Sequence, residues 1–274
     1  MSNICRLLAE KGSTWAYAIM SGVLAFVPEE VFKHGFIPCK WSETSIVIAN
    51  RILLFLLIFV LSNLIYCLYR KIRRSVSLFD RTTDIKVEYG NICKVSKGIK
   101  VINFDECYTT AVGTRPEEIK PESVCGQYLK QYPITDIKPI LEQAGIKPNG
   151  KSKFHGKDCY EPGILLPRDD FCLMAFAKLD EGGRVFHTYE SYLKCLDKLW
   201  EQIDLYHGTK DVYIPILGSR ITRFDKELTQ QELLDIMIAS YRLHPKKLRT
   251  PNLLHIVCKE REGFSLNNIF GVDK

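Results

Sequence analysis

Two polar segments of this 274-residue chain carry residue types that could bind or react with a ligand. The first, residues 105–114, begins with Asp105 and Glu106 and follows an apolar run at 99–104. These adjacent carboxylates could contact a ligand, and either could serve as a general base. A solvated loop or the first turn of a helix would contain the same residues, so the pair alone leaves these interpretations open.

The second polar segment, residues 218–223, has the chemistry of a phosphate-binding turn and follows an apolar run at 212–217. Such a turn needs open backbone N–H groups, hydroxyls and guanidinium groups. The segment supplies all three through Gly218, Ser219, Arg220, Thr222 and Arg223. An ordinary turn after a strand can have the same composition, so both interpretations stand at this point.

The elements that must position these segments alternate between strands and helices. The apolar runs that predict strands are 86–95, 100–104, 171–179, 212–217 and 253–258. A 3.6-residue apolar period predicts a helix at 188–206, a capping-box pattern predicts another that starts at Thr229, and shorter helices fit 122–131 and 136–144. This alternation predicts an α/β fold with a largely parallel or mixed sheet, whose ligands bind at the carboxyl ends of the strands.

Residues 1–74 differ from the rest and are predicted to contain two transmembrane helices. Residues 52–69 form an apolar run that would be about 27 Å long as a helix. The run at 14–27 is shorter, and could be a short span, an interfacial helix or a signal-peptide core. The sequence favours spans at about 14–27 and 46–69, a connector at 75–86 and a separate domain at 87–274.

The basic residues around these runs predict an orientation. Arg6 and Lys11 precede the first run, and Arg70, Lys71, Arg73 and Arg74 follow the second. The positive-inside rule then places both chain ends in the cytoplasm, with a short external loop between the spans. We therefore expect a multi-pass membrane protein, with residues 87–274 in the cytoplasm and the lipid bilayer as a partner.

Charge and cysteine content argue against two other classes. The 200 residues after position 74 hold 29 basic and 28 acidic side chains, which gives no support to a nucleic-acid partner. The ten cysteines are widely spread and include no Cys-x-x-Cys pair, so we expect no metal site. Free cysteines in apolar runs fit a reducing compartment.

Several stretches taken together resemble a known family. They are Gly-Asn-Ile at 90–92, Val-Ile-Asn-Phe-Asp-Glu-Cys-Tyr at 101–108, Tyr-Glu-Pro-Gly at 160–163, Leu-Trp-Glu-Gln-Ile at 199–203 and the segment 214–223. Their order and spacing resemble the macro-like domain of the membrane-anchored Thoeris effectors of bacterial antiphage defence, which follows two membrane spans. The resemblance covers roughly residues 85–260 and implies a three-layer α/β/α sandwich that binds ADP-ribose-type nucleotides.

The resemblance also implies which residues contact the nucleotide. Asn91 falls where macro domains commonly place an adenine-contacting aspartate, and asparagine is a departure from that pattern. Arg220 departs too, because it replaces a small residue. The loop around the distal ribose would contain Asn103, Asp105 and Glu106, and the diphosphate loop Gly218, Ser219, Arg220 and Thr222.

The function implied by the resemblance is that of a signal-gated effector without catalytic residues or cofactor. A TIR-domain enzyme would make an ADP-ribose-derived signal, such as an amino-acid conjugate like histidine-ADP-ribose. The effector, located in the bacterial inner membrane, would bind this nucleotide, form a homo-oligomer and disrupt the host membrane, causing abortive infection. Two alternatives remain open: a membrane-tethered ADP-ribosylhydrolase that uses Asp105 or Glu106 as its base, and a membrane anchor that docks a protein.

Overall fold

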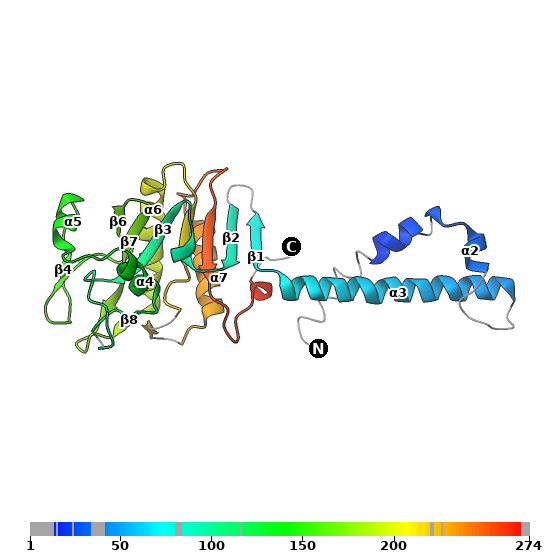
Figure 1. Cartoon of the computed structure of the whole chain (residues 1–274), viewed down its shortest axis with the longest axis horizontal. Helices are drawn as coiled ribbons and strands as arrows, with labels where there is room; N and C mark the ends of the chain where they lie inside the picture. The colour runs from blue at the N-terminus through cyan, green and yellow to red at the C-terminus, as the bar shows by residue number, and fades with distance from the viewer. Residues whose placement is uncertain are drawn as a thin grey trace. The chain divides into compact units, whose positions relative to one another are not determined.

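The computed structural model describes residues 14, 16–23, 25–33, 42–79, 84–115, 117–219, 222–225 and 227–269. The chain divides into two compact units, Met1–Arg73 and Arg74–Lys274. The larger unit is built around one sheet, whose strands can be followed in Figure 1.

The smaller unit contains helix α3, Glu43–Ile72, whose 30 residues extend over about 45 Å. Ser42 caps its first turn, because the Ser42 hydroxyl accepts a hydrogen bond from the backbone N–H of Ser45. The most apolar 18 residues of α3 have a mean hydropathy of 2.5. Among the described residues, α3 alone is long and apolar enough to cross a membrane, and it contains the predicted span at 46–69.

The predicted span at 14–27 does not correspond to a second helix that is long and apolar enough to cross a membrane, in the part of the chain that the structure describes. Residues 16–23 and 25–26 are helical, and the short helix α2 (Glu29–Lys33) follows Pro28. A 14-residue helix is about 21 Å long, which is shorter than a hydrocarbon core of about 30 Å. The described residues therefore contain one candidate span where the sequence predicted two.

The sheet of the larger unit has nine strands, with the order β1-β2-β11-β9-β3-β7-β8-β10 and with β6 paired to β7. The neighbours from β2 to β7 are parallel, whereas β1, β6 and β8 pair antiparallel with β2 or β7. The mixed sheet that the sequence predicted is confirmed. Its strands are β1 (Ser75–Phe79), β2 (Asp84–Tyr89), β3 (Ile99–Asp105), β6 (Leu165–Arg168), β7 (Phe171–Leu179), β8 (Val185–His187), β9 (Val212–Pro215), β10 (Arg223–Phe224) and β11 (Leu254–Cys258).

The helices of the larger unit lie close to their predicted positions. They are α4 (Val124–Gln131), α5 (Lys138–Gln143), α6 (Tyr189–Tyr206) and α7 (Gln230–Leu243), with the 3₁₀ turns η1 (Ile92–Lys94) and η2 (Leu266–Asn268) and the small hairpin β4 (Gly150–Lys151) and β5 (Asp158–Cys159). The predicted capping box of α7 is present, because Thr229 and Glu232 each accept a hydrogen bond from the other's backbone N–H.

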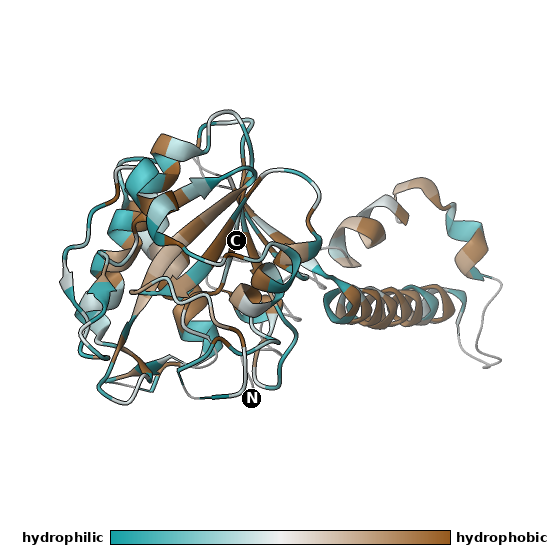
Figure 2. Ribbon diagram, turned by 60° about the vertical axis from the view of Figure 1, so that its left-hand side comes forward, coloured by the Kyte–Doolittle hydropathy of each residue, from teal (hydrophilic) through white to brown (hydrophobic). Residues whose placement is uncertain are grey.

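Two apolar cores on opposite faces of the sheet make the larger unit a three-layer sandwich. One core joins Val101 of β3 to α6 and α7 through side chains such as Trp200 and Met237. The other joins Ile102 to α4 and α5 through side chains such as Tyr128 and Leu141. Successive strand residues point to opposite faces, which explains why Val101 and Ile102 belong to different cores. Figure 2 shows the resulting apolar strands between amphipathic helices.

The segment 75–86 is not the connector that the sequence predicted, because it forms β1 and the start of β2. Val76 and Leu78 alternate with Ser75 and Ser77, and pair across the hairpin with Val87 and Ile85. These four apolar side chains are buried in the core under α6 and α7. The alternation of apolar and polar residues at 75–79 therefore explains the strand, although five residues are too few to be distinguished from a polar linker in the sequence.

Candidate functional site

A cleft of about 420 Å³ opens at the carboxyl ends of the parallel strands. Its walls come from the segments that follow β2, β3, β9 and β11, together with the end of β7 and the start of α4. This is the edge at which α/β sheets bind ligands. Asp105 from the first polar segment and most of the second polar segment line this cleft, because β3 and β9 are parallel neighbours.

The turn after β9 forms one wall of the cleft and is fixed by contacts with α6 and Phe224. Gly218 has a φ of +79°, which non-glycine residues seldom adopt. A Cβ added to Gly218 would lie 2.8 Å from Cζ of Phe224. The carbonyl of Leu217 accepts a hydrogen bond from the Tyr192 hydroxyl at 3.3 Å, so the turn is fixed to α6. A fixed turn without a side chain gives a ligand access to the backbone, as phosphate binding requires.

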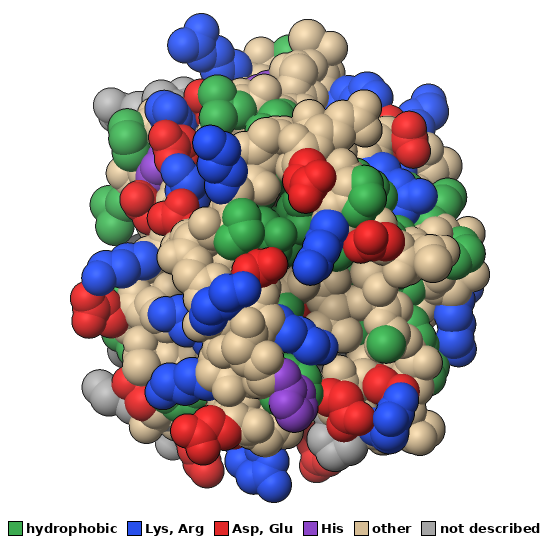
Figure 3. Space-filling view, turned by 90° about the vertical axis from the view of Figure 1, so that its left-hand side faces the viewer, with side chains coloured by type: hydrophobic (Ala, Val, Ile, Leu, Met, Phe, Trp, Pro, Cys, Tyr) green, Lys and Arg blue, Asp and Glu red, His purple; other side chains and the backbone are tan. Residues whose placement is uncertain are grey.

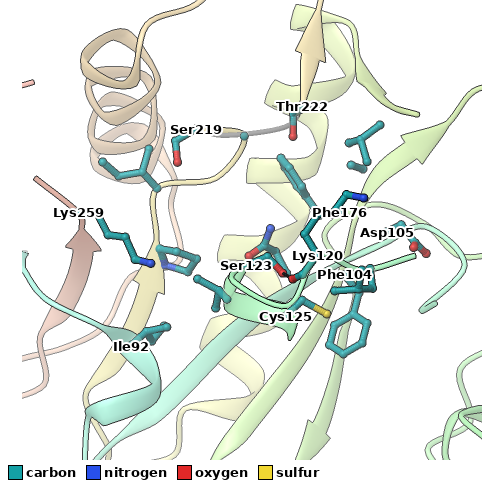
Figure 4. Close-up of a pocket in the computed structure, with 18 of the residues that line it drawn as sticks. Ile92, Phe104, Asp105, Lys120, Ser123, Cys125, Phe176, Ser219, Thr222 and Lys259 are labelled. Atoms are coloured by element: carbon teal, nitrogen blue, oxygen red, sulfur yellow. Dashed lines mark hydrogen bonds between the residues drawn. The ribbon is translucent and has the colours of Figure 1, made fainter. Parts of the chain in front are cut away.

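Ser219 and Thr222 continue this wall. Both line the cleft, and Figure 4 shows their side chains directed toward the space that Phe176 also borders. The predicted contact Arg220 lies outside the described residues. The hydroxyl part of the predicted anion site is therefore present in the cleft, and the part played by Arg220 stays a prediction.

The carboxyl end of β3 contributes Asn103 and Asp105 to the cleft, so both belong to the strand and not to the loop that the sequence predicted. Oδ1 of Asp105 accepts hydrogen bonds from the backbone N–H groups of Cys107 at 2.9 Å and Thr109 at 3.0 Å. Burial raises the pKa of Asp105, and these hydrogen bonds oppose the rise. Asp105 therefore has a structural task in ordering its own loop, besides bordering the cleft.

Glu106 is placed differently from its predicted role at the distal ribose. It is not among the residues that line the cleft, and its side chain is buried. Its Oε1 accepts hydrogen bonds from the Ser152 hydroxyl at 2.5 Å and from the backbone N–H of Leu179 at 3.1 Å. Glu106 thus ties the β4–β5 hairpin to the end of β7, and its adjacency to Asp105 in the sequence is no guide to its direction.

Asn91 lines the cleft beside the end of β2. Its Oδ1 accepts a hydrogen bond from the backbone N–H of Cys93 at 3.1 Å and caps η1. Its Nδ2 donates to Oε1 of Gln127 on α4 at 2.9 Å. The amide is therefore oriented on both sides, and a carbonyl oxygen has a second lone pair for another donor.

Other side chains in the cleft were not predicted from the sequence. They come from β7, the region around the start of α4 and the segment after β11. Those labelled in Figure 4 include Phe176, Lys120, Ser123, Cys125 and Lys259, and Arg261 also lines the cleft. The rule that ligands bind after parallel strands could have indicated Lys259 and Arg261, because both follow β11. The residues around α4 lacked such a signal.

His187 supports the aromatic wall of the cleft. Its Nε2 donates a hydrogen bond to the carbonyl of Phe176 at 2.8 Å, and its ring stacks with that of Phe224 at 6.2 Å between centroids. Burial lowers the pKa of His187 to about 4, and the hydrogen bond to Phe176 opposes this shift. The side chain is therefore neutral at pH 7.

We predict that His187 makes the fold sensitive to acid. Between pH 7 and pH 4 the unfolded chain binds a proton at this histidine that the folded chain does not, so the free energy of unfolding falls as the pH falls. The loss attributable to His187 is at most about 3 kcal/mol. Urea unfolding at pH 7 and pH 4.5 tests this against His187→Gln, which cannot titrate. Parallel losses in the two proteins would contradict the prediction.

Comparisons with known proteins find a family model and a relative that match most of this chain. The family model described as "Thoeris protein ThsA, Macro domain" matches residues 85–259. The chain is 30% identical over 230 residues to the Thoeris protein ThsA of Bacillus amyloliquefaciens (strain Y2), covering 78% of this chain and 77% of that protein.

Solved structures similar to this chain include macrodomains. A mutant Oceanobacillus iheyensis macrodomain with ADPR is 11% identical, with a TM-score of 0.46, and the match covers 68% of this chain and 91% of that one. The Thermus aquaticus DarG macrodomain is 10% identical, with a TM-score of 0.36, and the match covers 64% and 97%. Because the family model spans more than half of the sequence and the ThsA relative covers most of it, the chain belongs to the Thoeris ThsA macro-domain family.

Proposed function

We propose that this protein is a membrane-anchored Thoeris effector whose cleft binds an ADP-ribose-derived signal. The observation that carries the proposal is the convergence of the Gly218 turn and the end of β3 at Asp105 on one cleft of about 420 Å³. That volume is in the usual range for small-molecule sites. The diphosphate would lie against the turn at Gly218 and Ser219, the distal ribose beside Asn103 and Asp105, and the adenine near Asn91.

The charges around the cleft support an anionic ligand with a further anionic group. Lys259 and Arg261 border the side near β11, while Arg184 and Arg223 border the side near β8 and β10. Two separated pairs of cations can bind a diphosphate and a second anion. A carboxylate from an amino-acid conjugate, such as histidine-ADP-ribose made by a TIR enzyme, has the required chemistry.

The cleft favours binding over hydrolysis. Glu106 is bound internally by Ser152 and Leu179, and Asp105 already accepts two backbone hydrogen bonds. No histidine is among the described residues that line the cleft. The hydrolase remains the second candidate, because the buried Asp105 carboxyl has a raised pKa and borders the ligand space.

The membrane part of the proposal rests on α3. Its apolar stretch is long enough to span a bilayer, and Arg70 and Lys71 in its last turn suit a cytoplasmic end. With one span the amino-terminal end would lie outside, and with the predicted second span both ends would lie inside. One or two helices leave no lumen within a single chain, so membrane damage requires a homo-oligomer. The signal drives the formation of this homo-oligomer because it binds the assembled protein more tightly than the free protein.

Nucleic acid is not a partner in this proposal. In the face shown in Figure 3, acidic and basic side chains are interspersed and do not gather by sign. A nucleic-acid-binding surface concentrates lysine and arginine on one face.

We expect ADP-ribose to raise the melting temperature of the full-length protein in detergent. At a concentration of 100 times Kd the added stability is about 2.7 kcal/mol. Thr222→Glu should abolish the shift by placing a carboxylate beside the diphosphate. Thr209→Glu is the matched control, because Thr209 is exposed in a turn outside the cleft. No shift for the unaltered protein would contradict the proposal, and steady breakdown of an ADP-ribosylated substrate would favour the hydrolase.

A further inference from the structure

Three consecutive residues after β11 face in two directions. Lys259 and Arg261 line the cleft. Glu260, between them, forms an ion pair with Arg74, with 3.1 Å between Oε1 and Nη2. The segment 259–261 therefore connects the wall of the cleft to the first residue of the larger unit.

This segment also touches the predicted phosphate turn. Nη1 of Arg261 donates a hydrogen bond to the carbonyl of Ser219 at 2.6 Å. Figure 4 shows the ammonium group of Lys259 directed into the cleft on the same side as Ser219. An anion bound at Ser219 would attract both cations, so occupation of the cleft changes the forces on 259–261.

Arg74 stands at the junction with the membrane helix. Only Arg73 separates it from Ile72, the last residue of α3. The carbonyl of Arg74 accepts a hydrogen bond from the backbone N–H of Tyr89 at 2.9 Å, and the next residue, Gly90, lines the cleft. Both connections of Arg74 thus end on segments that form the cleft wall.

We propose that the segment 259–261 relays ligand binding in the cleft to the end of α3 through the Glu260–Arg74 ion pair. The inference rests on the proposed function, because it concerns the same cleft and the same anionic ligand. The phosphate draws Lys259 toward the turn at Ser219, to which Arg261 is already hydrogen-bonded, and thereby alters the Glu260–Arg74 pair. Arg74, two residues after the end of α3, is thereby held differently in the bound and free states.

The size of this coupling is bounded by the exposure of the pair. The side chains of Arg74 and Glu260 are 74% and 65% exposed, and exposed ion pairs are weak. If the pair differs between the two states, its removal changes ADP-ribose affinity by at most about fivefold, and the effect on the junction is reciprocal. The Glu260–Arg74 pair therefore shifts the equilibrium between the bound and free states only slightly, and the shifts of several copies in an oligomer would add.

The test measures hydrogen exchange at the Tyr89 amide, which is bonded to Arg74, in the full-length protein in detergent with ADP-ribose as the probe. We expect saturating ADP-ribose to change this exchange rate at least about twofold. Glu260→Gln should bind ADP-ribose within about fivefold of the unaltered protein and lose most of the change. Glu262→Gln, an equal charge change at an exposed neighbour, should retain it.

The exchanged pair, Arg74→Glu with Glu260→Arg, should restore the change at Tyr89 if the ion pair carries it. An unchanged Tyr89 rate in the unaltered protein with ADP-ribose bound would overturn the relay and leave the proposed ligand intact. A full response in Glu260→Gln would overturn it as well. Absence of ADP-ribose binding in the unaltered protein would overturn the proposed function, and the relay with it.

Discussion

Replacing Gly218 with alanine is expected to abolish ADP-ribose binding and to destabilise the larger unit. The residue has a φ of +79°, and an L-residue in the left-handed region costs about 1–2 kcal/mol. The new Cβ would also lie 2.8 Å from the ring of Phe224, closer than real contacts allow. Phe224 or the turn must move, and either movement alters the wall on which the diphosphate is proposed to lie.

A matched control separates the two costs. Gly145 has a similar φ of +70°, and a Cβ added there would meet no atom within 4 Å. Gly145→Ala should therefore show the backbone cost alone and leave ADP-ribose binding unchanged. We expect Gly218→Ala to lose at least about 1 kcal/mol more than Gly145→Ala in urea unfolding. Calorimetric titration with ADP-ribose completes the test, and normal binding by Gly218→Ala would refute the assignment of the turn.

The turn at Gly218 also shows what a sequence can indicate about a site. A glycine followed by hydroxyl and basic residues after a buried run was enough to predict its place at a strand end. The contact with Phe224 could not be foreseen, because it depends on the pairing of β8 with β10, a two-residue strand. So short a strand has no period to detect.

The direction of the Glu106 side chain is an example of what the sequence could not predict. The sequence placed it beside Asp105 on a polar loop, and the structure turns its carboxylate inward to Ser152. Glu106 and Ser152 are 46 positions apart in the sequence, so only the tertiary fold brings them together. Long helices behaved differently: α6 and α7 begin with hydroxyl caps and keep a 3.6-residue apolar period, both of which are local signals.

A charge in the middle of α3 is expected to end the proposed effect of the protein on membranes. Leu61 lies near the centre of the apolar stretch and is 45% exposed, so it would face lipid if α3 crosses the bilayer. Leu61→Arg would then cost roughly 2.5–3.5 kcal/mol of insertion free energy. Leu61→Phe keeps the side chain large and apolar and serves as the matched control.

The measurements are carbonate extraction of cell membranes, growth on expression together with a TIR enzyme, and ADP-ribose binding by the purified protein. Leu61→Arg should reduce the membrane-bound fraction and abolish growth arrest, because a helix that does not insert cannot join a membrane assembly. It should bind ADP-ribose normally, since the cleft lies wholly in residues 90–261. Growth arrest by Leu61→Arg at full strength would mean that the toxicity does not depend on α3, and would favour an enzymatic activity of the cleft instead.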